Sequence, residues 1–127
     1  MVNQITQKII GAAIEVHRHL GPGLLESTYE ECLAKELELT NLSFQRQRAL
    51  PVVYKDLQLD CAYRVDFFIA NQIVVELKSV DEIHPIHIAQ LLTYLRLMDK
   101  QVGLLINFNV PILREGIRRV VNNYIPD

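Results

Sequence analysis

The spacing of apolar residues predicts helices at the start of the chain and strands in its middle. Residues 4–20 and 27–39 carry apolar side chains three and four positions apart, which is the spacing of amphipathic helices. The sequence Gly21-Pro22-Gly23 separates these two stretches. Glycine and proline end helices, so we expect two helices joined by a short loop.

The next stretch changes to the alternating pattern of β-strands. We predict strands over residues 43–54, 58–69 and 72–80, and a hairpin turn at 70–72 between the last two. Pro51 lies inside the first of these strands. Because proline has no N–H to donate to a neighbouring strand, we expect an edge strand or a bulge there.

The last third of the chain returns to the helical period and then alternates again. Residues 85–99 show helical spacing, and Pro85 suits the first helical position. Residues 102–108 predict a short buried strand, and 111–124 predict a last amphipathic helix. The order of elements indicates one α/β domain over residues 1–127, with a mixed sheet covered by helices.

Composition limits the classes of partner. The chain has 127 residues, half of them hydrophobic, which is enough for a sizeable core. The formal net charge is only −2. This balance argues against a broadly basic protein that binds nucleic acid non-specifically. Contact with phosphates would therefore require a local patch or metal ions.

The two cysteines and the N-terminal sequence indicate the cellular compartment of the protein. Cys32 and Cys61 have neither CxxC nor zinc-site spacing, and we interpret both as small buried apolar residues. Two isolated cysteines fit a reducing cytosol, so we expect a cytoplasmic protein. The chain has no basic start followed by a long apolar run, and no apolar run of about 18 residues. We therefore expect neither a signal peptide nor contact with a membrane.

Three ionisable residues interrupt the apolar second and third strands: Asp66, Glu76 and Lys78. Glu76 and Lys78 are two positions apart, so a strand directs both to one face. A three-residue connection sets Ile69 opposite Ile73, and the same register sets Asp66 opposite Glu76, with Cβ atoms about 5 Å apart. Two facing carboxylates need a cation, which Lys78 supplies in part and a divalent ion would supply more fully.

An ordinary strand surface would show the same pattern. Solvated strand faces with a Glu-Lys pair are common, and such pairs contribute little to stability. A register shift of one residue would place Asp66 opposite Val75 instead. From these residues alone, a catalytic site and a solvated face both remain open.

The motifs resemble those of a known nuclease superfamily. Asp66 followed by Glu76-Leu77-Lys78 is similar to the D-…-(D/E)xK core of the PD-(D/E)XK nuclease superfamily, with Val65 where the named motif has proline. Gly23-Leu24-Leu25-Glu26-Ser27-Thr28-Tyr29 resembles the GxxExxY signature that names one family within it. Gln90-Leu91-Leu92-Thr93-Tyr94 resembles the QxxxY motif of the RecB-like branch.

The resemblance spans residues 5–122 and implies both a fold and an activity. The fold is a restriction-endonuclease-like core, αβββαβ, with a mixed central sheet flanked by helices. The activity is metal-dependent hydrolysis of phosphodiester bonds in nucleic acid, and we expect DNA rather than RNA as the substrate. By similarity, Asp66, Glu76 and the backbone carbonyl of Leu77 bind Mg²⁺ or Mn²⁺. Lys78 holds or helps to deprotonate the attacking water.

The other motif residues each have a second interpretation. By resemblance, Glu26 orients water or a second metal ion, but an acid at a helix N-terminus is also stabilised by the helix dipole. Tyr29 lies one turn further on and can pack in the core with its hydroxyl near the site. Gln90 and Tyr94 share one helix face, which lies toward the metal centre or DNA, or forms a polar edge on a core helix.

Several arginines could contact phosphates. Arg46 and Arg48 are expected on one strand face, Arg64 precedes the candidate site, and a further group lies on the predicted last helix. That group consists of Arg114, Arg118 and Arg119. A solvated surface position is the alternative for each arginine.

We therefore consider three functions. The first is a magnesium-dependent nuclease, and the second is a catalytically inactive module on the same fold that binds nucleic acid or protein. The third is a structural or oligomerising domain whose charges are incidental. A homodimer is compatible with a nuclease of this size, although no motif in the chain points to one.

Overall fold

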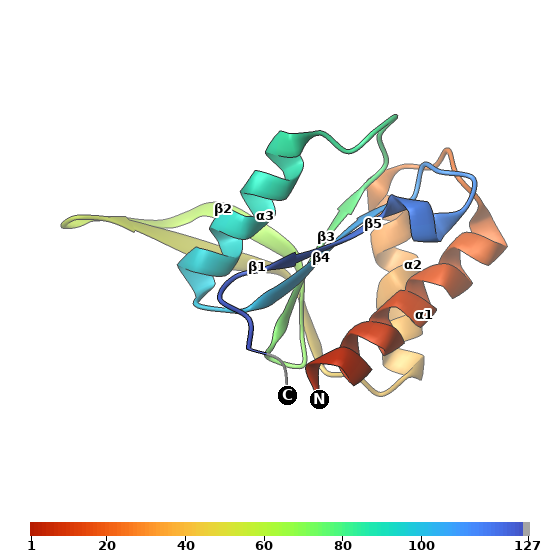
Figure 1. The fold of residues 1–127 in the computed structure, drawn as a ribbon, viewed down its shortest axis with the longest axis horizontal. Helices are drawn as coiled ribbons and strands as arrows, with labels where there is room; N and C mark the ends of the chain where they lie inside the picture. The colour runs from red at the N-terminus through yellow and green to blue at the C-terminus, as the bar shows by residue number, and fades with distance from the viewer. Residues whose placement is uncertain (126–127) are drawn as a thin grey trace.

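The computed structural model describes residues 1–125, apart from the side chains of residues 61 and 62. It shows a five-stranded sheet between two layers of helices (Figure 1). The elements are α1 (Val2–Leu20), α2 (Glu26–Leu39), β1 (Phe44–Tyr54), β2 (Leu57–Ile69), β3 (Ile73–Lys78), α3 (Pro85–Met98), β4 (Val102–Asn107), the 3₁₀ helix η1 (Leu113–Gly116) and β5 (Ile117–Val121).

The sheet is mixed, as the sequence predicts. Its strand order is β1-β2-β3-β4-β5, and β3 and β4 are parallel while the other pairs are antiparallel. α3 connects the two parallel strands. Pro85 is at its first turn, as predicted. Because parallel strands need a crossover, the helix lies across one face of the sheet.

Two apolar clusters fill the two faces. α1 and α2 cover one face, where Ile9, Leu33, Phe67 and Phe108 are buried together. α3 covers the other face (Figure 1) and buries a smaller cluster. The central strands β3 and β4 are almost entirely buried because both of their faces are covered. A charged residue near the end of β3 therefore lies in unusually apolar surroundings.

The hairpin between β2 and β3 has the predicted register. Ile69 pairs with Ile73, and the backbone N–H of Gln72 donates to the Ile69 carbonyl at 3.0 Å. Ala70 and Asn71 adopt left-handed conformations, with φ of 54° and 57°. These two residues turn the chain tightly enough to fix which residues of the two strands face each other.

The predicted last helix over 111–124 is wrong. The chain instead forms η1 and then β5, which pairs antiparallel with β4 from Val102–Val121 to Ile106–Ile117. Without β5, the backbone groups on one side of the buried strand β4 would have no partner. The β-branched residues of β5 favour a strand, and their apolar positions fit either period.

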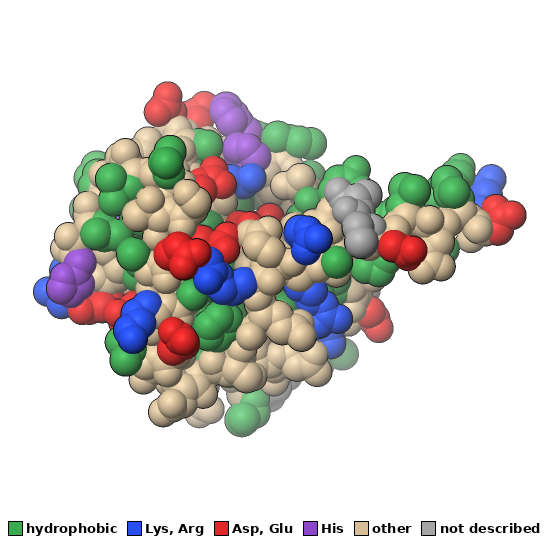
Figure 2. Space-filling view, turned by 180° about the vertical axis from the view of Figure 1, so that it is seen from behind, with side chains coloured by type: hydrophobic (Ala, Val, Ile, Leu, Met, Phe, Trp, Pro, Cys, Tyr) green, Lys and Arg blue, Asp and Glu red, His purple; other side chains and the backbone are tan. Residues whose placement is uncertain are grey.

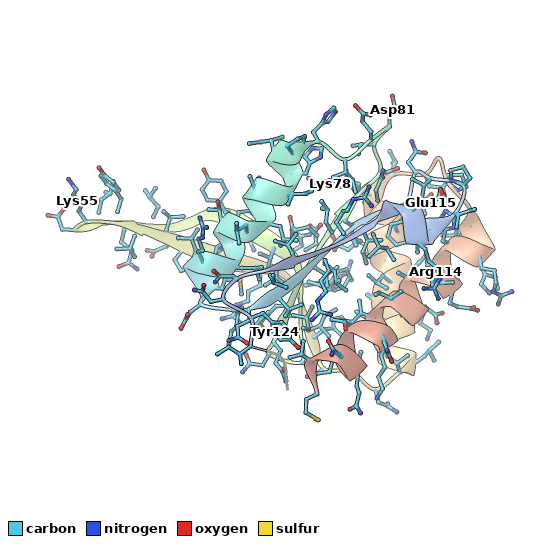
Figure 3. The ribbon with its side chains drawn as sticks, viewed as in Figure 1. Lys55, Lys78, Asp81, Arg114, Glu115 and Tyr124 are labelled. Carbon is cyan, nitrogen blue, oxygen red and sulfur yellow. The ribbon has the colours of Figure 1, made fainter. Side chains whose placement is uncertain are left out.

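β1 and β2 continue beyond the rest of the sheet as a two-stranded arm. The register shifts between Leu50 and Val52, which confirms the irregularity predicted at Pro51. Lys55 lies at the tip of the arm, far from the helices (Figure 3). The arm exposes Tyr54 and Leu57, so it contributes little to the core.

The remaining sequence predictions concern cysteines and membranes. Cys32 is only half-buried and packs against the cluster under α1 and α2. Cys61 has its side chain outside the described part of the structure. Among the helices described, none is long and apolar enough to cross a membrane.

Candidate functional site

Asp66 and Glu76 meet where β2 and β3 stop pairing through their backbones. The last backbone pair is Phe67 with Val75. One residue further, the Asp66 backbone N–H donates to Glu76 Oε2 at 2.7 Å. The Leu77 backbone N–H donates to Asp66 Oδ2 at 2.8 Å. Each carboxylate thus binds the backbone of the opposite strand, and this exchange places the two acids side by side.

The strand alternation breaks at Asp66. Val65 belongs to the cluster under α3, whereas Phe67, two residues later, belongs to the cluster under α1 and α2. On β1, Gln47 lies between Arg46 and Arg48, which pair with Phe67 and Val65, and it has a φ of 49°. In a regular strand, residues two apart share a face, so both backbones change direction here. This change leaves Asp66 at the junction of the two faces.

The same irregularity separates two arginines that we expected on one face. Arg46 pairs with Glu30 and Glu31 of α2. Arg48 lies over the ring of Phe68, 4.8 Å from its centroid, in the cluster under α3. The prediction of a shared face is wrong because the left-handed Gln47 between them interrupts the period of two.

Burial makes the two carboxylates difficult to ionise together. Glu76 is only 7% exposed. Burial, and then the neighbouring negative charge of Asp66, raise the pKa of Glu76 to about 8. Burial also raises the pKa of Asp66, although hydrogen bonds from Leu77 and Gln47 oppose the change. Without a cation, Glu76 therefore retains its proton at a pH where exposed carboxyls are fully ionised.

Lys78 ends β3 two residues after Glu76, with its backbone fixed by the neighbouring strand. Its carbonyl accepts the Phe108 N–H at 2.9 Å, and Figure 3 shows the residue at the end of β3. Val74 belongs to the cluster under α3. Because side chains alternate along a strand, Glu76 and Lys78 are directed to the face of the sheet that α3 covers. The positive charge of Lys78 favours the ionised form of Glu76, but by less than burial opposes it.

Glu26, the first residue of α2, borders the carboxylates. Its Oε2 accepts the Ser79 backbone N–H at 3.3 Å, and the Ser79 hydroxyl donates to the Leu24 carbonyl at 2.6 Å. These bonds connect the start of α2 to the residue that follows Lys78. The charge of Glu26 contributes to the raised pKa values of both Asp66 and Glu76.

Tyr29 lies in the core and stabilises the loop before α2. Its ring is fully buried and stacks on Phe108 at 4.4 Å between centroids. Its hydroxyl donates to the Gly21 carbonyl at 2.6 Å and accepts the Leu24 N–H at 3.2 Å. Tyr29 therefore fixes the loop that carries Glu26 without itself contacting Asp66.

The two motif residues of α3 have different environments. Tyr94 is buried in the cluster under α3 and lies 6.3 Å from Tyr63 between ring centroids. Burial raises the pKa of Tyr94, and the charges of Glu76 and Asp66 add to the effect. Gln90, one turn earlier, is exposed. The structure thus brings Tyr94 to the carboxylates and leaves Gln90 at the surface.

Comparison with known families identifies the arrangement. A family model described as the PD-(D/E)XK nuclease superfamily matches residues 3–120. The chain belongs to this superfamily. Its mixed sheet flanked by helices is consistent with the restriction-endonuclease-like fold of these proteins. Comparisons with curated proteins and with solved structures give no match. Membership of the GxxExxY family and of the RecB-like branch stays a prediction.

PD-(D/E)XK nucleases generally use divalent metal ions, and the residues present fit such an ion. Among the side chains that the structure describes, no three His, Cys, Asp or Glu residues form a group that could hold a metal. Mg²⁺ does not need three, because it keeps several waters and binds through one or two carboxylates. Asp66 and Glu76 supply such a pair, and a divalent ion would neutralise the charges that burial disfavours.

The arginines at the C-terminal end do not form a helical cluster. Arg118 donates to the Glu115 carbonyl at 2.8 Å, and Arg119 lies over the Tyr124 ring, 5.1 Å from its centroid. Arg114 belongs to η1 instead. Figure 2 shows acidic and basic side chains interspersed on the face opposite to that of Figure 1. Among the described side chains of that face, Lys and Arg do not gather into a broad basic surface.

Sequence reasoning missed two residues that support the site. Asn107 is buried at the end of β4, where its Oδ1 accepts the Val80 N–H at 3.1 Å and its Nδ2 donates to the Val80 carbonyl at 3.0 Å. This exchange fixes the segment after Lys78. A polar residue ending an apolar strand was a weak signal for it. Gln47 contacts Asp66 and had no signal in the sequence.

Proposed function

We propose that this protein is a metal-dependent nuclease that hydrolyses phosphodiester bonds in DNA. One observation carries the proposal: the buried carboxylate of Glu76 and the half-buried carboxylate of Asp66 each accept a backbone N–H from the other's strand, and Lys78 follows Glu76 two residues later. Two neighbouring acids that are largely removed from water are unfavourable for stability unless a cation joins them. Their retention beside a lysine supports a site built for a metal ion and a phosphate.

Asp66, Glu76 and the Leu77 carbonyl would hold Mg²⁺ or Mn²⁺. When bound, such an ion lowers the pKa of water and stabilises the charge that develops on a phosphodiester. The hydrogen bonds between the two strands orient both carboxylates before any ion arrives. This prior orientation reduces the reorganisation that binding would require.

Lys78 holds the attacking water and balances negative charge at the phosphate. Its backbone is bonded to Phe108, and Asn107 holds the segment that follows, so the side chain starts from a fixed point. Glu26 lies on the adjacent start of α2, where a carboxylate can orient a water molecule. Tyr94 lies near the carboxylates on α3, and Gln90, which is exposed on the same helix, would contact the nucleic acid.

Cleavage of labelled DNA tests the proposal directly. Single-stranded DNA, double-stranded DNA and RNA are incubated with the wild type in Mg²⁺, Mn²⁺ or EDTA. Lys78→Ala is compared with Lys8→Ala, which removes an exposed lysine of α1. We expect DNA cleavage that EDTA and Lys78→Ala both abolish and that Lys8→Ala retains. Folded wild type that binds metal and cleaves none of these substrates would contradict the proposal and favour the inactive binding module.

A further inference from the structure

The side-chain amide of Gln47 bridges two carboxylates on different elements. Its Nε2 donates to Glu30 Oε1 of α2 at 2.6 Å and to Asp66 Oδ1 of β2 at 3.1 Å. Ionised carboxylates only accept hydrogen bonds, so the amide must present its nitrogen to both. One N–H is directed at each acid, and the chemistry of the two partners fixes the orientation of the amide.

The backbone of Gln47 is held in a conformation that side chains rarely adopt. Its φ of 49° lies in the left-handed region, inside a strand. The Arg64 guanidinium donates to the Gln47 carbonyl at 2.9 Å and helps to hold this turn. Such strain persists only where the surroundings impose it, and it is concentrated at functional sites. Here it directs the Gln47 side chain toward Asp66.

The far end of the bridge is also fixed. Glu30 accepts the Gln47 amide on Oε1, while its Oε2 accepts Arg46 Nη2 at 2.9 Å. The guanidinium of Arg46 forms an ion pair with Glu30 and fixes the position of the carboxylate that accepts the amide. The connection therefore runs from α2 through β1 to the carboxylate on β2.

These contacts leave Asp66 with a donor on each oxygen. The Leu77 N–H binds Oδ2 and the Gln47 amide binds Oδ1. We propose that Gln47 is a positioning residue that fixes the plane of the Asp66 carboxylate, so that Asp66 and Glu76 can share one metal ion. This inference rests on the proposed nuclease function. Partners that orient metal ligands in this way typically change metal affinity or activity about 10–100-fold when removed.

Manganese binding measured by calorimetry tests the role without relying on catalysis. Gln47→Gly removes the amide but suits a positive φ, so the variant should unfold no more easily than its control. The control is Gln45→Gly, on the same strand, whose side chain contacts Arg48 and not the site. We expect the Mn²⁺ dissociation constant to rise about 10–100-fold in Gln47→Gly and to stay unchanged in Gln45→Gly.

The outcomes separate this inference from the function on which it rests. If the wild type and Gln47→Gly bind Mn²⁺ equally, Gln47 does not position Asp66, and the nuclease proposal stands. If the wild type binds Mn²⁺ no better than Asp66→Asn does, the metal site itself is wrong, and both proposals fail. A cleavage rate of Gln47→Gly that rises toward the wild type as Mn²⁺ is increased supports positioning, and a rate that stays low at saturating Mn²⁺ contradicts it.

Discussion

Glu76→Gln should stabilise the metal-free protein at high pH. In the folded chain the pKa of Glu76 is raised from its ordinary 4.5 to about 8 by burial and by the charge of Asp66. The folded state therefore holds this proton more tightly than the unfolded state does. The stability that the proton contributes is complete below pH 4.5 and is lost as the pH rises through about 8.

The size of the effect follows from the difference between the two pKa values. A rise from 4.5 to about 8 corresponds to at most roughly 5 kcal/mol of unfolding free energy lost when Glu76 ionises. Asp66 changes in the same direction and adds to the loss. Gln at position 76 cannot ionise, and its oxygen can still accept the Asp66 N–H. The variant should therefore avoid the part of the loss that comes from Glu76.

Urea unfolding followed by circular dichroism, in EDTA from pH 5 to pH 9, measures this difference. We expect Glu76→Gln and the wild type to be similar near pH 5 and to diverge by a few kcal/mol near pH 9. Glu38→Gln, an exposed change on α2, is the control and should follow the wild type throughout. If Glu76→Gln gained no stability over the wild type between pH 5 and pH 9, our account of the buried pair would be refuted.

Two further predictions concern the residues that hold the end of β3 and β4, and urea unfolding at pH 7 checks both. Asn107→Ala removes the acceptor of the half-buried Val80 N–H and leaves the Val80 carbonyl with only the longer bond from Asn109 Nδ2 at 3.4 Å, so it should lower stability by about 1–3 kcal/mol. An unchanged urea midpoint would contradict this role of Asn107. Gly116→Ala places a Cβ against the Asn107 carbonyl oxygen and should lower stability by about 1–3 kcal/mol or more. Gly11→Ala, on α1 with open space around it, should instead raise stability by about 0.5–1 kcal/mol, and equal effects of the two glycine changes would refute the steric argument.

The sequence was sufficient for the elements whose structure is set locally. Helical spacing predicted α1, α2 and α3, and the short connection at 70–72 predicted the register that pairs Ile69 with Ile73. The same register predicted that Asp66 and Glu76 lie near each other across the hairpin, and the structure brings them together. A hairpin turn and a period of two are properties of neighbouring residues, so a single chain segment carries enough information to fix them.

The end of the chain shows where local patterns become insufficient. The apolar positions of residues 117–121 suit a helix or a strand, and the segment became β5 because β4 needs a partner on its open side. That need arises only once the sheet has formed. The spacing of apolar residues within 117–121 does not show this need, because β4 is a separate segment of the chain, connected to β5 through a loop and η1.

Tertiary structure alone decided how the candidate site is supported. Gln47 and Asp66 are 19 positions apart in the sequence. Their contact depends on the left-handed backbone of Gln47, which no sequence pattern predicted. The same break in alternation sends Arg46 and Arg48 to different faces. The sequence thus determined which acids could meet across one hairpin. Packing of α2, β1 and β2 decided how Asp66 is held. Contacts between side chains of different elements follow no regular spacing in the sequence, so the sequence pattern does not predict them.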